Sequence, residues 1–336
     1  MEPNTTLTIF WAAVIAFAII MYVILDGFDL GVGILFGVVH EEEHRDIMMN
    51  SVAPVWDGNE TWLVMGGGGL LATFPLAYSV LFPAIYAPLI AMLLGLAFRG
   101  VAFEYRWRAT SGRFIWNAAF AGGSMVAAFA QGMALGTILQ GVEVADRAYA
   151  GGWWDWLTPF SILTGLAVVV GYILLGSTWL ILKTEGALQE RAFGIARVAG
   201  VLTLGFIVAV SIWTPLLGDA YLARWWNWPN TLLFAPVPVL VGVIAVFFWF
   251  ALTARRERAP FLLALCLFVL SYAGLAISMY PYIAPPSLTI FDAAAPASSQ
   301  IFLIYGAPVL LVILLCYTAY SYWVFRGKVN MKIGYH

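Results

Sequence analysis

The sequence predicts an all-α, polytopic membrane protein with about nine transmembrane helices and no soluble domain. Of its 336 residues, 62% are hydrophobic and 10% are charged, whereas soluble domains have about a quarter of their residues charged. The mean hydropathy is +0.90. Apolar runs that are long enough to cross a bilayer core of about 30 Å follow one another with short polar gaps. We therefore expect residues 1–336 to form a single transmembrane domain.

Nine apolar segments account for most of the chain. They lie at 7–38, 51–73, 76–106, 114–140, 157–182, 194–217, 231–253, 260–283 and 300–325. The third segment contains Pro83 and Pro88, but neighbouring helices can satisfy the carbonyl groups that a proline frees inside a membrane. We therefore expect this segment to form one continuous helix.

The basic residues predict how these helices are oriented, because cytoplasmic loops are enriched in Lys and Arg. With nine spans, all but two of the 16 Lys and Arg residues fall on one face of the membrane. This group comprises Arg45, Arg99, Arg106, Arg108, Arg113, Lys183, Arg191, Arg197, Arg255, Arg256, Arg258, Arg326, Lys328 and Lys332. The opposite face has Arg147 and Arg224, so we expect an outside N-terminus and a cytoplasmic C-terminus.

Tryptophans mark the opposite, outer face. Their amphipathic indole rings favour the headgroup region, so an aromatic belt is the simplest interpretation, and a platform for a quinone or a lipid headgroup is the alternative. These residues are Trp153, Trp154, Trp156, Trp225, Trp226 and Trp228.

Ionisable residues lie inside the first two segments. Each such residue costs about 2.5–3.5 kcal/mol on insertion scales, and therefore suggests a function. The first segment contains Asp26 and Asp29, which are three residues apart and share one helix face. The second contains Asp57 and Glu60 with the same spacing. Asn59 adds a neutral donor and acceptor between them.

The third segment carries Arg99 and Glu104 near its cytoplasmic end. Counting about 1.5 Å per residue places Asp29, Asp57 and Glu104 in the cytoplasmic half of three consecutive helices, so we expect these carboxyl groups to meet. Closely spaced buried carboxylates cannot all ionise, and such groups are suited to passing protons. The alternative is that Arg99 neutralises one or two of them and that the others form structural hydrogen bonds between helices.

Small residues at a four-residue spacing predict close contacts between helices. The pairs are Gly27 and Gly31, Gly33 and Gly37, and Gly132 and Gly136. An unbroken run of four glycines at 66–69 weakens the second helix. We expect close packing there, with a hinge as the alternative.

Several classes of function are not expected from this composition. The net charge is −2, so no basic field favours nucleic acid. The three histidines, His40, His44 and His336, lie outside the apolar segments, which argues against haem or copper ligation by histidine within the bilayer, although methionine remains available as a ligand. Cys266 and Cys316 lie in apolar segments without metal-site spacing, and we expect them to be buried free thiols.

Three motifs resemble subunit II of the cytochrome bd family of quinol oxidases. They are DGFDLGVG at 26–33, WDGNETW at 56–62 and FEYR at 103–106. The order and spacing of the first two are specific, and the chain length and helix number fit throughout. The ending VFRGK at 324–328 is similar to the cyanide-insensitive branch of the family.

The resemblance implies a bacterial inner-membrane complex that oxidises quinol, reduces dioxygen to water and generates a proton motive force. It implies that haems b and d are bound by a partner, subunit I, and not by this chain. Some members also contain a structural quinone or a small single-helix subunit. For this chain the resemblance implies two four-helix bundles plus one peripheral helix, and a role in supplying protons from the cytoplasm.

The resemblance also assigns candidate site residues. Asp57 matches the family's intramembrane aspartate, and Glu104 stands at a position that is Asp in some members. The expected proton pathway has five carboxyl side chains, and these are Glu104, Asp57, Asp26, Asp29 and Glu60. Four further side chains are expected to support the pathway, and these are Trp56, Asn59, Trp62 and Arg99.

Two other functions remain open at this point. A stand-alone proton-coupled transporter also needs carboxylates within the membrane and glycine-rich helices. A scaffold that folds and seals the partner subunit needs neither. If the chain is an oxidase subunit, we expect no catalytic residue and no metal ligand in it. This holds whether it conducts protons or acts only as a scaffold.

Overall fold

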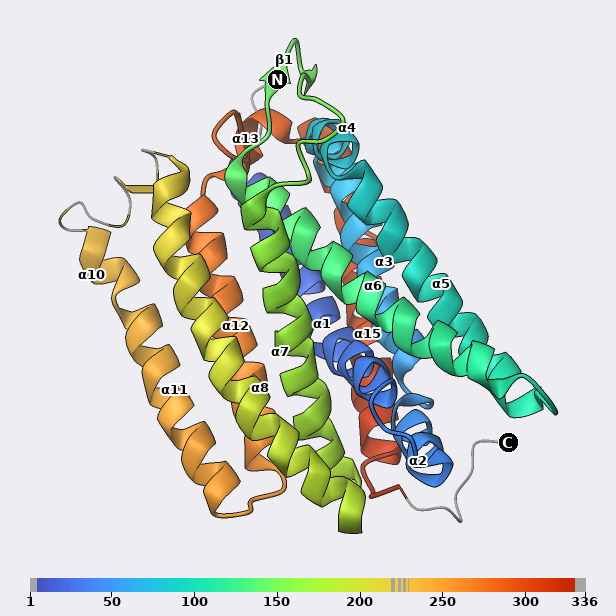
Figure 1. The fold of residues 1–336 in the computed structure, drawn as a ribbon. Helices are drawn as coiled ribbons and strands as arrows, with labels where there is room; N and C mark the ends of the chain where they lie inside the picture. Colours follow the sequence, from blue (N-terminus) through green and yellow to red (C-terminus); the bar gives the residue numbers. More distant parts are fainter. Residues whose placement is uncertain (1–4, 219–220, 223–224, 226–227, 229, 330–336) are drawn as a thin grey trace.

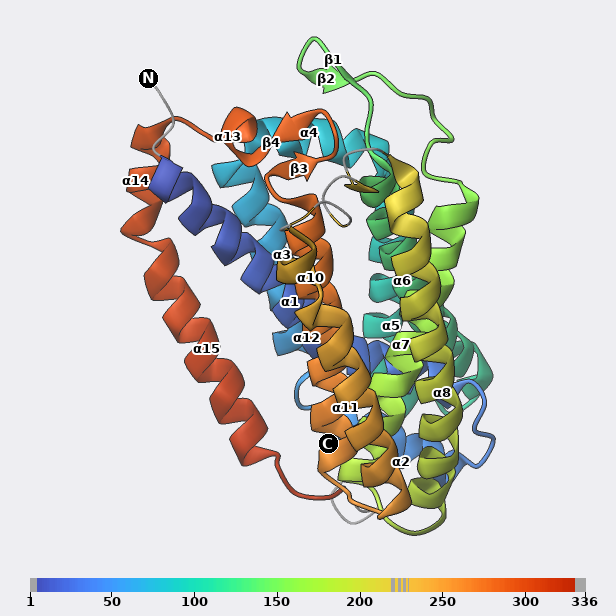
Figure 2. The ribbon, with the colours of Figure 1, turned by 90° about the vertical axis from the view of Figure 1, so that its left-hand side faces the viewer.

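The computed structural model describes residues 5–218, 221–222, 225, 228 and 230–329. Four residues discussed above, Arg224, Trp226, Lys332 and His336, lie outside these ranges. The described part of the chain is helical apart from connecting segments and two short antiparallel hairpins (Figures 1 and 2). The hairpins are β1 (Val144–Ala145) with β2 (Ala148–Tyr149), and β3 (Tyr282–Ala284) with β4 (Leu288–Thr289).

The helices follow the apolar segments closely. They are α1 (Thr5–Phe36), α2 (Glu42–Val52), α3 (Trp56–Thr73), α4 (Pro75–Ala84), α5 (Tyr86–Arg108), α6 (Arg113–Gln140), α7 (Pro159–Lys183), α8 (Gly186–Trp213), η1 (Thr214–Leu217), α10 (Asn230–Phe234), α11 (Pro236–Thr253), α12 (Ala259–Met279), α13 (Ile290–Ala293), α14 (Ala297–Ile304) and α15 (Ala307–Val324). Within the described ranges, eight of them are long and apolar enough to cross a membrane: α1, α5, α6, α7, α8 continued by η1, α11, α12 and α15. The helix α3 runs beside them with 18 residues, and its polar first turns and four glycines lower its hydropathy. With α3 included, the prediction of about nine spanning helices is confirmed.

The long helices form two groups of four that lie side by side (Figures 1 and 2). The first group contains α1, α3, α5 and α6, and the second contains α7, α8, α11 and α12. The helix α1 also packs against α7 and so joins the groups. The helix α15 lies at the periphery, where the structure buries none of its residues fully. This is the arrangement that the resemblance predicts.

The predicted continuous helix at 76–106 is wrong. The chain leaves the helical conformation at Ile85, with φ −107° and ψ 18°, and this residue separates α4 from α5. The helix α4 lies across the end of the first group (Figure 2). Pro88 follows in the first turn of α5, where its missing N–H leaves no intrahelical bond unmade. In a continuous helix the same proline would have left the Ala84 carbonyl without its partner.

Glycines set the closest contacts between helices, as the spacing predicts. A Cβ atom at Gly31 would lie 1.8 Å from the carbonyl oxygen of Tyr172, and one at Gly176 would lie 2.4 Å from the carbonyl carbon of Gly31. The backbones of α1 and α7 therefore touch. Gly132 and Gly136 approach α7 in the same way, from α6.

The two ends of the molecule differ. The helix α2 lies at one end, which we call the α2 end, and α4 with both hairpins lies at the other, the α4 end (Figures 1 and 2). At the α4 end, Trp153, Trp154 and Trp228 lie in segments that connect helices, and their side chains are exposed. Cys266 and Cys316 are free thiols, as expected, but both are exposed on the outside of the bundle, so the prediction that they are buried is wrong.

The peripheral helix α15 is held at the α2 end by Lys183, the last residue of α7. The Lys183 ammonium donates to the carbonyl oxygens of Phe325 and Gly327, just beyond the end of α15. The backbone N–H of Val329 donates to the Lys183 carbonyl oxygen at 2.8 Å. These bonds satisfy carbonyl groups that the end of a helix leaves without partners.

Candidate functional site

The buried charges of the first group gather around Arg99 of α5. The Arg99 side chain is fully buried, and its Nη1 donates to Asp26 Oδ1 at 2.7 Å. Nη1 also lies 3.4 Å from Glu60 Oε1, and Nη2 lies 3.8 Å from Asp29 Oδ2. Together with Asn59, these four residues form what we call the Arg99 cluster.

Helix geometry explains why these side chains meet. Asp26 and Asp29 precede the end of α1 by ten and seven residues, and Arg99 precedes the end of α5 by nine. At 1.5 Å per residue these positions lie roughly 10–15 Å from the helix ends, at matching depth. The helix α3 begins only at Trp56, so its first two turns, with Asn59 and Glu60, reach the same level.

Asn59 connects the cluster to α15. Its Nδ2 donates to Asp29 Oδ2 at 2.7 Å and to the Leu25 carbonyl oxygen at 3.3 Å, while its Oδ1 accepts from the Tyr322 hydroxyl at 3.0 Å. The structure thus places Asn59 in contact with the cluster, and its supporting role stays a prediction. Tyr322 was missed, because a tyrosine in a terminal apolar segment carries no signal of a buried partner.

The two supporting tryptophans are packing residues of α3. The Trp56 ring stacks on Phe103 with centroids 4.8 Å apart, and the guanidinium carbon of Arg99 lies 5.9 Å from it. Trp62 is fully buried and meets Phe17 edge to face at 5.8 Å. The Trp56 ring borders the Arg99 guanidinium with apolar surface and so raises the cost of leaving a charge there unpaired.

Asp57 and Glu104 do not join the cluster within this chain. Glu104 is exposed and lies 3.5 Å from Arg108, one turn on, in a salt bridge. It is five residues from Arg99, which at about 100° per residue turns it some 140° away around α5. Asp57 is likewise exposed, on the outward face of α3. The expected meeting of Asp29, Asp57 and Glu104 is therefore wrong for the isolated chain, because matching depth was counted and the facing direction was not.

A second buried arginine, which the sequence analysis did not select, lies two turns along α5. Arg106 donates from Nε to Asn117 Oδ1 at 2.7 Å, from Nη1 to Asp46 Oδ1 at 2.6 Å and from Nη2 to Glu42 Oε2 at 2.9 Å. We call these four residues the Arg106 cluster. It fastens α2 across α5 and α6 at the α2 end. The signal in the sequence was the seven-residue spacing of the two arginines, which places them on one face of the helix.

A chain of neutral polar groups leads from the Arg99 cluster toward the second group of helices. The Tyr172 hydroxyl of α7 donates to Gln131 Oε1 at 2.7 Å, and Gln131 Nε2 donates to the Tyr22 hydroxyl at 2.7 Å. Tyr22 lies one turn before Asp26 on α1 and interacts with it electrostatically. In the sequence, the one indication of this polar chain is the amide of Gln131, which lies within an apolar segment.

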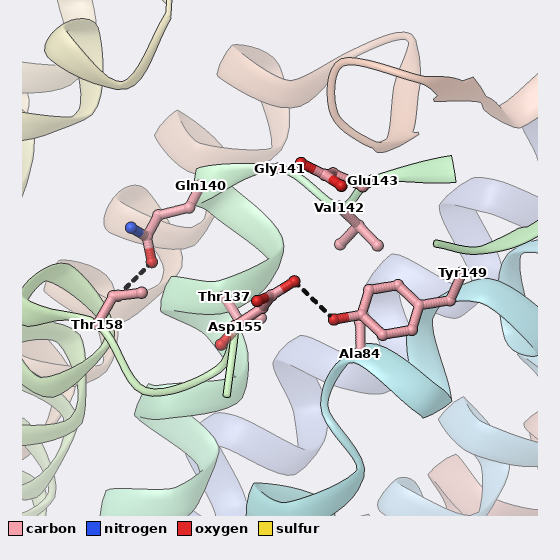
Figure 3. A pocket seen from close by; sticks show the side chains of 9 residues that line it. All are labelled: Ala84, Thr137, Gln140, Gly141, Val142, Glu143, Tyr149, Asp155 and Thr158. Atoms are coloured by element: carbon pink, nitrogen blue, oxygen red, sulfur yellow. Dashed lines mark hydrogen bonds between the residues drawn. The ribbon is translucent and has the colours of Figure 1, made fainter. Parts of the chain in front are cut away.

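A pocket of about 270 Å³ lies at the α4 end, under the β1–β2 hairpin (Figure 3). Its lining residues are Ala84, Thr137, Gln140, Gly141, Val142, Glu143, Tyr149, Asp155 and Thr158. The Tyr149 hydroxyl donates to Asp155 Oδ2 at 2.9 Å. Burial and this hydrogen bond raise the pKa of Tyr149 to about 12, so the phenol stays protonated at neutral pH and fixes the hairpin.

The comparisons with known proteins agree with this architecture. The family model described as Cytochrome bd terminal oxidase subunit II matches residues 7–325. Cytochrome bd-I ubiquinol oxidase subunit 2 of Escherichia coli (strain K12) is 32% identical over an alignment of 361 positions, which covers 96% of this chain and 95% of that protein. Cytochrome bd ubiquinol oxidase subunit 2 of Bacillus subtilis (strain 168) is 29% identical over 96% of both chains.

A solved structure has the same fold. A chain in the structure of bd oxidase from Geobacillus thermodenitrificans matches with a TM-score of 0.76 and 21% identity, over 96% of this chain and 99% of that chain. The family model and the relatives cover nearly the whole sequence. The chain therefore belongs to the family of cytochrome bd terminal oxidase subunit II.

Proposed function

We propose that this chain, as subunit II of a cytochrome bd-type quinol oxidase, supports the haem-bearing subunit I and supplies it with protons from the cytoplasm. Membership of the family makes it part of an oxidoreductase complex and a multi-pass protein of the bacterial inner membrane. The observation that carries the proton role is the Arg99 cluster, in which three carboxyl groups share one guanidinium. A stand-alone transporter is not favoured, since the relatives are oxidase subunits over almost their full length.

The charge balance of the cluster supports proton binding. Three ionised carboxylates and one guanidinium would leave a net charge of −2, because three negative charges face one positive charge. Uncompensated charge in a low-dielectric interior is costly. Asp26 Oδ2 and Asp29 Oδ1 are buried and have no hydrogen-bond partner among the described residues. These oxygens are therefore placed to accept a proton or a water molecule.

Glu60 connects the buried cluster to the outside of the chain. Its side chain is 25% exposed and reaches Arg99 on the inside. On the outside it interacts electrostatically with Asp57, one turn earlier on α3. We propose that protons approach by way of Glu104, pass Asp57 and Glu60, and reach Asp29 and Asp26.

The direction of uptake follows from the proposed orientation, with the α2 end in the cytoplasm. Arg45 and Arg106 lie in or against α2, Lys183 ends α7, and Arg191 lies in the second turn of α8 at the same end. Arg147 lies in the β1–β2 hairpin at the α4 end. This distribution agrees with the enrichment of basic residues on the cytoplasmic side and supports an outside N-terminus.

Replacing Asp57 with Asn is expected to slow quinol-driven oxygen consumption severalfold, because the amide keeps the shape of the side chain and cannot carry a proton. The haem content of the purified complex should persist. The measurement is oxygen uptake per haem, with Glu190→Gln, at an exposed position of α8, as the control. Unchanged turnover would remove Asp57 from the pathway, and loss of haem would make its role structural.

The outward face of α3 is open to packing by a helix of another subunit. Asp57, Val64, Gly68 and Leu71 are all exposed and follow one another on that face. No atom of the described residues lies within 4 Å of a Cβ placed at Gly68, so the backbone of another helix is free to approach closely. We propose that subunit I packs on this face, which brings Asp57 to the boundary between the subunits.

Replacing Gly68 with Leu is expected to weaken the association with subunit I, because the added side chain occupies the space of the partner backbone. Gly205→Leu is the matched control, since Gly205 is an equally open glycine on α8. The measurement is the haem that co-purifies with the tagged chain, read from reduced-minus-oxidised spectra. Equal haem in both variants would argue against this interface.

The haems of the complex are assigned to the partner for a chemical reason. Haem iron is commonly held by an axial histidine. His40 and His44 lie before and within α2, outside the spanning helices. These donors do not fit a haem site in the bilayer, and we propose that subunit I binds haems b and d. The structural quinone, the single-helix subunit and the cyanide-insensitive subgroup stay predictions.

A further inference from the structure

Two arginine clusters are stacked inside the first group of helices. Arg99 and Arg106 are seven residues apart on α5, which places them on one face about 10 Å from each other. Both side chains are fully buried. The Arg106 cluster opens to the α2 end through Asp46 and Glu42, which are 25% and 49% exposed. The shortest route from that end to the Arg99 cluster would therefore pass between the two arginines.

Four aromatic rings lie between them, one from each helix of the group. Trp56 of α3 stacks on Phe103 of α5 at 4.8 Å, Phe103 meets Phe120 of α6 edge to face at 5.0 Å, and Phe120 meets Phe36 of α1 at 5.0 Å. Phe36 and Phe120 are fully buried, and Phe103 is nearly so. The rings form a contiguous row across the interior, which we call the aromatic layer.

Each arginine borders the layer from its own side. The guanidinium carbon of Arg99 lies 5.9 Å from the Trp56 ring and 6.0 Å from the Phe103 ring, and that of Arg106 lies 5.3 Å from the Phe36 ring. These are cation–π distances, so the layer is held between two fixed positive charges. A further barrier to a proton arises because each positive charge repels it.

Aromatic ring carbons offer water no hydrogen-bond partners of the kind that order a chain of water molecules. An ordered internal water needs two to four hydrogen-bond partners, and hydrophobic constrictions close aqueous pathways by excluding water. The side chains of the layer offer no acceptor in line between the clusters, since the Trp56 indole N–H is a donor only. Protons on the Arg106 side are thus separated from the carboxylates on the Arg99 side.

We propose that the aromatic layer insulates the Arg99 cluster from the Arg106 cluster and so directs proton uptake through Asp57 and Glu60. The inference rests on the proton role proposed above. Phe103, one of the two inner rings of the row, is a positioning residue that acts by excluding water. The insulation makes uptake depend on the face of α3 that meets subunit I, and it prevents a direct path from the α2 end.

The test is a bypass experiment in the Asp57→Asn complex. Adding Phe103→Asn places a polar amide in the layer, so that water can connect the two clusters. Oxygen consumption per haem is expected to rise severalfold above that of Asp57→Asn alone. Phe103→Leu in the same background is the matched control, and it should give no rise because leucine keeps the layer apolar. Phe120→Ser opens the same layer from α6 and should reproduce the rise if Phe103→Asn fails to assemble.

The outcomes separate this inference from the one on which it rests. Slow turnover in Asp57→Asn that neither polar substitution raises, at full haem content, would overturn the insulation and leave uptake through Asp57 standing. Wild-type turnover in Asp57→Asn alone would overturn the uptake route and the inference with it. An experiment that leaves the layer intact is infrared hydrogen–deuterium exchange of the buried carboxyl groups. Exchange should be slower in Asp57→Asn than in the unsubstituted complex, and equal rates would contradict the proposal.

Discussion

Replacing Arg99 with methionine is expected to destabilise the folded chain by about 3–5 kcal/mol, the cost of removing one partner from a buried ion pair. The substitution leaves Asp26 and Asp29 buried without the guanidinium that both of them face. A loss of this size is a large fraction of the 5–15 kcal/mol that typically stabilises a protein. The measurement is the thermal unfolding temperature of the purified complex, together with its yield.

Two further variants show whether charge is the cause. Arg108→Met is the matched control, because Arg108 is 81% exposed and its pair with Glu104 should contribute no more than about 1 kcal/mol. Adding Asp26→Asn to Arg99→Met removes one of the stranded carboxylates and should recover part of the lost stability. An Arg99→Met complex as stable as the Arg108→Met complex would show that the cluster does not need its guanidinium.

Replacing Gly31 with Ala is expected to cost about 3 kcal/mol or more, at the upper end of the range for overpacked interiors. The new methyl group would lie 1.8 Å from the backbone oxygen of Tyr172, and no change of rotamer moves a backbone atom away. The helices α1 and α7 must separate, which also disturbs Asp29 two residues earlier. Unfolding temperature and haem content measure the effect.

Gly122→Ala is the matched control for Gly31→Ala. A Cβ at Gly122 of α6 meets no atom of the described residues within 4 Å. Alanine there should be neutral or stabilise the helix by up to about 1 kcal/mol, because glycine is the poorer helix former. Similar losses in the two variants would mean that the contact between α1 and α7 yields more easily than the geometry indicates.

The sequence predicted the parts of this protein that depend on local composition. Apolar runs of bilayer length placed the spanning helices, since hydrogen bonds within each helix are the means by which a backbone crosses a membrane. The spacing of Asp26 and Asp29 indicated a shared helix face, and their neutralisation by Arg99 was predicted as the alternative to a proton relay. The predictions of the spans and of the shared face each depend only on residues within a single helix, and the periodicity of the sequence reports on such residues directly.

The parts that the sequence did not predict depend on two helices at once. Glu104 was placed by depth alone, and its direction around α5 turns it away from Arg99. Tyr322 reaches Asn59 across 263 positions of the chain, a pairing that no periodicity encodes. The turn at Ile85 depends on the packing of α4 across the end of the bundle. At that end the chain no longer has to run parallel to the spanning helices.

The bond between Tyr322 and Asn59 also bears on how the protein is made. The first three long helices leave the ribosome early, and they bring with them the acidic groups, the arginine and the amide. The hydroxyl that completes the amide's bonding belongs to Tyr322 of α15, 263 positions later in the chain, and emerges after them. The Asn59 side chain thus completes its bonds only after α15 has joined the helices that precede it, so an early folding intermediate has an acceptor at this position that the folded chain does not leave open.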